Sequence, residues 1–187
     1  RFGLRTPMPL VGFATGNTFA TFLRALGAEL EAGRLSPAFI ATHLDEYVGL
    51  GPGDPRSFRH FVRANLCAPV GIPDAAHDAP DGLAADLEGE CARYEAAIAQ
   101  AGGVDLAVLG LGRNGHLAFN EPGSSLAGRT RVEVLMRVEL GDDGTRVPLP
   151  RVAITMGVGT ILASRACLVV AFGFEKERAV AEMIEGS

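Results

Sequence analysis

The stretch LGLGRNGHLAFNEPGSS, residues 109–125, places side chains that can move protons in a glycine-rich turn. His116 is of the residue type best suited to general acid–base work near neutral pH. Asn114 precedes it by two residues and Glu121 follows it by five, so both can orient the imidazole. These residues therefore predict either an oriented catalytic histidine or a purely structural one.

The same stretch spells Gly-x-Gly-x-x-Gly at Gly110, Gly112 and Gly115, the spacing found in dinucleotide-binding folds. That fingerprint requires the glycines to open a helix, with an acidic residue about 20 positions further on. Here Pro122 interrupts any early helix, and residues 128–133 are arginine-rich with no obvious strand end. We therefore expect the glycines to form a tight turn in which side chains converge.

Two further segments favour an anion. ATGNT, residues 14–18, follows an apolar run and opens a helical pattern, where backbone N–H groups and the helix dipole attract negative charge. It is not a GxxxxGK[ST] loop, so a monophosphate is expected before a nucleoside triphosphate. In GFEKE, residues 173–177, Lys176 is the only lysine of the chain, and a bound anion would explain a cation in that first turn. The alternatives are an ordinary capped helix and a solvated lysine.

Asp45 and Glu46 directly follow an apolar run that predicts a strand. Two adjacent carboxylates at the end of a strand can serve as a helix cap or as a general base. The residues alone leave both roles open.

The elements that must position these groups alternate along the chain. Continuous apolar runs predict strands at residues 9–14, 39–44, 104–112, 132–135 and 166–173. Helical spacing predicts helices at residues 19–33, 57–66 and 83–102, a short one within 154–164, and one after Gly173. This alternation predicts an α/β fold, a mostly parallel, Rossmann-like sheet flanked by helices, in a single domain. Ligands of such sheets bind at the carboxyl ends of the strands, where the polar clusters fall.

Composition excludes several classes of function. With 48% hydrophobic and 21% charged residues, the 187-residue chain is globular. A net charge of −5 argues against nucleic acid as a partner, and no apolar run approaches the roughly 20 residues of a membrane span. Nothing at the start resembles a signal peptide. Cys67, Cys91 and Cys167 have no zinc-type spacing, so we expect buried thiols in the cytoplasm.

Five segments in order resemble the glucosamine-6-phosphate deaminase family, which includes glucosamine and galactosamine-6-phosphate isomerases. They are ATGNT, HLDEYVGL, LGLGRNGHLAFNEPGSSLAGRTR, ITMGVGTIL and FGFEK. The resemblance implies the fold of sugar-phosphate isomerases and an enzyme of amino-sugar catabolism that converts glucosamine 6-phosphate to fructose 6-phosphate and ammonia. It implies no cofactor and no metal, a small amino-sugar phosphate as the partner, and a homo-oligomer as one compatible state.

The resemblance also implies roles for residues. Asp45 would move a proton between C2 and C1 of the open-chain sugar, and His116 would open the pyranose ring, held by Asn114 and Glu121. The residues that would bind the substrate phosphate are Thr15, Gly16, Asn17, Thr18 and Lys176.

The chain departs from the family pattern in three ways. Many members have Asp where this chain has Asn114, and an amide carries no charge to stabilise imidazolium. The segment after residue 135, with Arg137, is about ten residues shorter than the family's lid. The family also extends beyond both ends of residues 1–187. Two alternatives are a 6-phosphogluconolactonase on the same fold, whose histidine segment lacks FNEPGSS, and a sugar-phosphate sensor that has lost the base or the histidine.

Overall fold

The computed structural model describes residues 8–36, 38–135 and 150–186, without the side chains of Asn17 and Thr18. Arg137, and with it most of the segment that we expect to be shorter than the family's lid, lies outside the described residues. Among the described helices, none has the length and apolar character that a bilayer crossing requires.

Four parallel strands form the central sheet in the order β2-β1-β4-β7. Each matches a continuous apolar run of the sequence, which is typical of strands buried by helices. The predicted α/β fold with a parallel sheet is thereby confirmed. The strands are β1 (Leu10–Phe13), β2 (Ile40–His43), β4 (Leu106–Gly110) and β7 (Cys167–Val170).

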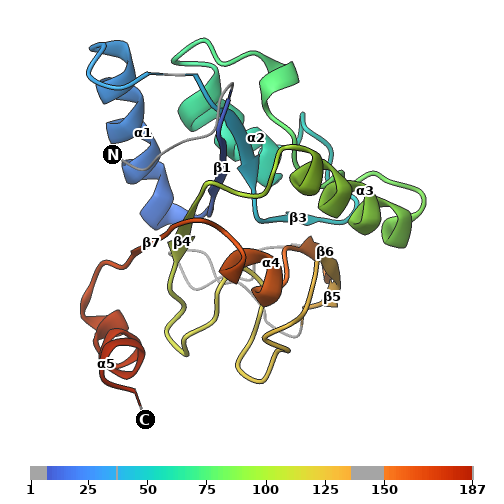
Figure 1. The fold of residues 1–187 in the computed structure, drawn as a ribbon, viewed down its shortest axis with the longest axis vertical. Coiled ribbons are helices and arrows are strands. Elements are labelled where there is room, and N and C mark those ends of the chain that lie inside the picture. Colours follow the sequence, from blue (N-terminus) through green and yellow to red (C-terminus); the bar gives the residue numbers. More distant parts are fainter. Residues whose placement is uncertain (1–7, 37, 136–149, 187) are drawn as a thin grey trace.

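Helices cover this sheet, with α1 on one side of β1 and α3 on the other (Figure 1). The helix expected at 83–102 begins later, because the Asp86 side chain accepts a hydrogen bond from the Gly89 N–H and so caps its first turn. The helix expected at 57–66 changes to a π-helix at Arg63–Cys67. The helices are α1 (Asn17–Glu31), α2 (Phe58–Val62), α3 (Leu87–Gln100), α4 (Val158–Leu162) and α5 (Glu177–Glu185), with 3-10 turns at Asp74–Ala76 and Phe174–Lys176.

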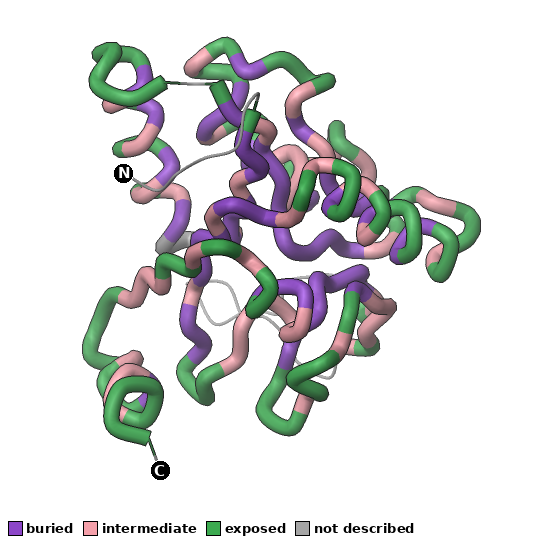
Figure 2. Tube along the Cα trace, viewed as in Figure 1, coloured by how far each residue is buried: buried purple, intermediate pink, exposed green. Residues whose placement is uncertain are grey.

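The core lies between the sheet and these helices, where Figure 2 shows the buried segments concentrated. The apolar stripe predicted for α1 faces it, since Phe19, Leu23 and Leu30 are all buried there. They pack with the sheet residue Phe13 and with Tyr94 of α3 in one hydrophobic cluster. Burial of this stripe ties the start of α1 to the carboxyl end of β1.

A second, antiparallel sheet is the main departure from the expected fold. Its strands are β3 (Asp45–Tyr47), β6 (Val152–Thr155) and β5 (Arg131–Val134), in the order β3-β6-β5. We expected Asp45 and Glu46 directly after a strand, and 132–135 as a strand of the mostly parallel sheet. Asp45 and Glu46 instead lie within a strand of their own, and Arg131–Val134 pairs antiparallel with β6, so both expectations are corrected. The reason is that β3, β5 and β6 are short and pair with segments far along the chain, so local patterns do not reveal the pairing.

The three thiols are free, as their spacing predicts, but only two of them are buried. Cys67 and Cys91 lie in the interior, and burial raises the pKa of each thiol to about 11. Cys167 is exposed on the edge strand β7, so the expectation of a buried thiol is wrong there.

Two buried histidines face each other at β2 of the parallel sheet. His43 Nδ1 lies 3.0 Å from His77 Nε2, and the two side chains come from β2 and from the loop before α3. Burial is the main cause that lowers the pKa of both imidazoles, for His77 to about 2, and the nearby Arg59 guanidinium acts in the same direction. Both rings are therefore neutral in the folded protein at neutral pH.

These histidines predict a loss of stability in mild acid. Their ordinary pKa is 6.5, so the unfolded chain takes up protons below that pH while the folded chain does not. His77 alone should lower the free energy of unfolding by about 1 kcal/mol between about pH 7.5 and about pH 5.5, and His43 acts in the same direction. Urea unfolding at both pH values measures the change. His77→Gln should lose the His77 share of this pH dependence, and an unchanged dependence in that variant would contradict the assignment.

Candidate active site

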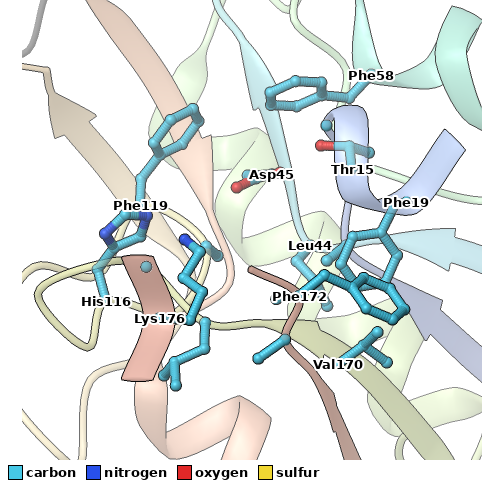
Figure 3. Close-up of a pocket in the computed structure, with 17 residues that line it drawn as sticks. Thr15, Phe19, Leu44, Asp45, Phe58, His116, Phe119, Val170, Phe172 and Lys176 are labelled. Atoms are coloured by element: carbon cyan, nitrogen blue, oxygen red, sulfur yellow. The ribbon is translucent and has the colours of Figure 1, made fainter. Parts of the chain in front are cut away.

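A cavity of about 300 Å³ opens at the carboxyl ends of the parallel strands. Figure 3 shows Thr15, Asp45, His116 and Lys176 around the same hollow, each from a different part of the chain. Gly16 also lines it. The structure thus brings together groups from all four predicted polar clusters. For Asn17 and Thr18 it describes only the backbone, which begins α1, and their side chains lie outside the described residues.

The end of the cavity that Gly16 and Thr15 form is suited to an anion. Gly16 precedes the 15-residue helix α1 with φ +101, a conformation that favours glycine, so the N-terminus of this helix lies at the cavity. Thr15 adds a hydroxyl there, and Lys176, at the N-cap of α5, adds a positive charge to the same cavity, on the side of His116 in the view of Figure 3. Helix N–H groups, a hydroxyl and an ammonium together are donors suited to a phosphate group.

Of the two adjacent carboxylates of β3, one caps a helix and the other is available as a general base, the two roles that the sequence leaves open. Successive side chains of a strand point to opposite faces. Asp45 lines the cavity, whereas Glu46 points into the protein and caps α2. The Glu46 carboxylate accepts hydrogen bonds from the Phe58 and Arg59 N–H groups at 3.0 and 2.9 Å and from the Ser57 hydroxyl at 2.8 Å.

Glu46 is 1% exposed, and its environment keeps it ionised. Burial opposes ionisation, but the hydrogen bonds and the neighbouring His43 outweigh it and lower the pKa of the carboxyl. The His43 Nε2 atom lies 3.6 Å from Glu46 Oε2. Because Glu46 is anchored on one face of β3, Asp45 is held on the other, facing the cavity.

A relay of two hydrogen bonds fixes the protonation of His116. A carboxylate only accepts, so the Glu121 Oε2 atom at 2.7 Å must receive the Nδ2–H of Asn114. The amide oxygen of Asn114 then faces His116 Nδ1 at 2.7 Å, which must carry the proton. The other ring nitrogen, Nε2, then carries no proton and has the chemistry of a proton acceptor. The predicted grouping of Asn114, His116 and Glu121 is therefore present in the structure.

The glycines of this loop make room for the histidine. A Cβ on Gly112 would overlap the His116 ring, at 1.9 Å from Nδ1, and Gly115 has φ +85. The Gly112 N–H donates to the His116 carbonyl at 2.9 Å, and the Gly112 carbonyl accepts from the Gly115 N–H at 3.0 Å. The loop leads into turns and not into a helix, so the tight turn that we expected of these glycines is present.

Sequence reasoning missed the aromatic wall of the cavity. Phe58, Phe119 and Phe19 all line it, and Phe58 and Phe119 stack with ring centroids 6.0 Å apart. Tyr47 packs behind them, 4.8 Å from Phe58 and 5.4 Å from Phe119. From sequence alone, a phenylalanine is assigned to the hydrophobic core, so only the fold shows that these rings line a site.

Across the described ranges, no group of three or more His, Cys, Asp or Glu side chains could hold a metal ion. The arrangement instead offers a carboxylate and an imidazole on either side of one cavity, with an anion-binding end. Such a pair can move two different protons of one bound molecule.

Comparison with known proteins agrees with this geometry. Residues 11–187 match the family described as glucosamine-6-phosphate isomerases/6-phosphogluconolactonase. The glucosamine-6-phosphate deaminase of Streptomyces avermitilis is 44% identical over 97% of this chain and 72% of its own length. The protein of that name from Mycolicibacterium smegmatis is 41% identical over 98% of this chain and 72% of its own length.

Solved structures give the same result. A monomeric glucosamine-6-phosphate deaminase superposes with a TM-score of 0.87 at 34% identity, over 97% of this chain and 78% of its own. A 6-phosphogluconolactonase from Thermotoga maritima superposes with a TM-score of 0.73 at 19% identity, over 96% and 77%, and so shares the fold. The chain therefore belongs to the family of glucosamine-6-phosphate isomerases and 6-phosphogluconolactonases.

Proposed function

We propose that this protein is a deaminating aldose–ketose isomerase that converts glucosamine 6-phosphate and water to fructose 6-phosphate and ammonia. The observation that carries the proposal is the single cavity that joins Asp45, the His116 relay and an anion-binding end. The relatives named for this reaction support it. Its place would be the cytoplasm, in amino-sugar breakdown, where a phosphorylated substrate is retained.

The first step is opening of the pyranose ring. The unprotonated Nε2 of His116 accepts the proton of the anomeric hydroxyl and delivers a proton to the ring oxygen, so the C1–O5 bond breaks and an aldehyde forms. Asn114 holds the imidazole in the tautomer that can accept, and its own amide is fixed by Glu121. A neutral amide does not stabilise imidazolium by charge, so the proton is best passed on within the same step.

The second step moves a hydrogen along the opened sugar. Asp45 takes the proton from C2, which is weakly acidic beside the aldehyde, and returns it to C1. The enolamine thus becomes an imine at C2, and water hydrolyses this imine to the ketone and ammonia. One carboxylate can serve two adjacent carbons only if the sugar is held in a fixed position. The anion-binding end, with Thr15, Gly16 and Lys176, would hold the phosphate and supply that constraint.

The direct test is ammonia release from glucosamine 6-phosphate by the purified chain. Hydrolysis of 6-phosphogluconolactone, measured in parallel, tests the other activity of the family. We expect ammonia and fructose 6-phosphate in equal amounts and no lactone hydrolysis above the uncatalysed rate. Lactone turnover without ammonia would overturn the proposal.

Replacing the two proton-transfer groups should give different defects. Asp45→Asn should lower kcat by about 10²–10⁴-fold and abolish deuterium entry from heavy water, because an amide cannot take the C2 proton. His116→Gln should slow the turnover of the closed-ring sugar. The small open-chain fraction still reaches Asp45 and acquires deuterium slowly. NMR of the fructose 6-phosphate formed in heavy water distinguishes them. Normal exchange with Asp45→Asn would show that another group is the base.

Lys176→Met should mainly weaken substrate binding. Loss of a charge-assisted contact of about 1.5–3 kcal/mol should raise KM by roughly 10- to 150-fold, with kcat changed much less. Lys176→Arg keeps the charge and should recover part of the affinity. Steady-state kinetics measures both. If kcat collapsed while KM stayed constant, Lys176 would belong to the chemical step and not to phosphate binding.

A further inference from the structure

The loop that carries His116 contains a residue in a strained backbone conformation. Ala118 has φ +52, a left-handed conformation that costs a residue with a Cβ about 1 kcal/mol or more. It lies in a tight turn in which the Asn120 N–H donates to the Leu117 carbonyl at 2.9 Å. Both Ala118 and Phe119 of this turn line the cavity. A strained turn at this place must be held by contacts from outside it.

Asn120 provides the first of these contacts. It is 3% exposed, and its Nδ2 donates to the Leu117 carbonyl at 2.9 Å and to the Met156 carbonyl at 2.8 Å, just beyond β6. Its Oδ1 accepts from Arg131 at 2.7 Å, which fixes the orientation of the amide. Arg131 is in turn paired with Glu133 at 2.8 Å.

Thr155 of β6 provides the second. It is fully buried, and its hydroxyl oxygen accepts the Phe119 N–H at 3.2 Å. Thr155 is also the register partner of Asp45 in the β3–β6 pair. Residues directly opposite in an antiparallel pair present their side chains on the same face. Thr155 therefore stands between the strand of the carboxylate and the loop of the histidine.

We propose that Asn120 and Thr155 are positioning residues that fasten the His116 loop to β6, and so fix His116 relative to Asp45. This inference rests on the proposed function, in which His116 and Asp45 act on one substrate in succession. A shift of about 1 Å in a reacting group costs on the order of 10²-fold in rate. Neither residue lines the cavity, so substrate affinity should depend on them little.

The test compares two buried threonines that each lose one hydroxyl. Thr155→Val removes the acceptor of the Phe119 N–H, and we expect kcat to fall by about 10- to 100-fold with KM changed less than about threefold. Thr155→Ser keeps the hydroxyl and should stay close to wild type. Thr160→Val is the matched control, since that 3% exposed side chain donates to Glu95 at 2.6 Å, away from the cavity. It should lower the melting temperature but not kcat.

A second measurement reads the histidine directly. The chain has four histidines, so the ¹⁵N signals of the His116 ring can be assigned with a His116→Gln spectrum as reference. Thr155→Val and the isosteric Asn120→Asp should broaden or shift these signals, and Thr160→Val should not. If Thr155→Val matches Thr160→Val in both kcat and spectrum, the inference is overturned. A wild type that releases no ammonia defeats the proposed function, while the spectra still decide the positioning.

Discussion

The buried carboxylate of Glu46 is the interaction on which the site depends. An ionised carboxylate taken out of water must be fully hydrogen-bonded, and Glu46 meets this demand with the N-terminus of α2 and the Ser57 hydroxyl. The bond set fixes which face of β3 points inward. It also brings α2, and with it Phe58, to the cavity wall. One satisfied charge thus orients the neighbouring Asp45 and shapes the space in front of it.

The same rule orders the opposite side of the cavity. Each polar group there has one hydrogen-bonding orientation that its neighbour permits: Glu121 accepts from Asn114, and Asn114 accepts from His116. Through Asn114, the Glu121 carboxylate therefore sets the tautomer of His116. This series of hydrogen bonds is rigid only if the loop that carries it is rigid. The hydrogen bonds from the His116 loop to β6 therefore matter as much as those within the loop.

The sequence predicted the parts of the protein that depend on local pattern. Strands β1, β2 and β4 were predictable because burial on both faces makes them continuous apolar runs, and α1 because its apolar residues share one face. The edge strand β7 is an apolar run as well, although it is largely exposed. The grouping of Thr15, Asp45, His116 and Lys176 followed from the rule that strand ends converge. Strand β3 was missed because three residues, two of them acidic, carry no strand signal without their partner β6.

What local pattern could not supply was the difference between residues of the same type. Asp45 and Glu46 are equivalent in sequence, yet one faces the cavity and the other a helix end. Asn114 and Asn120 differ similarly, because one amide orients an imidazole and the other binds two carbonyls. In the sequence, Thr155 looks like an ordinary strand residue, although its hydroxyl oxygen accepts the Phe119 N–H of the His116 loop. These distinctions arise from long-range pairing, so the antiparallel sheet that the sequence did not reveal is the element that sets the geometry between base and imidazole.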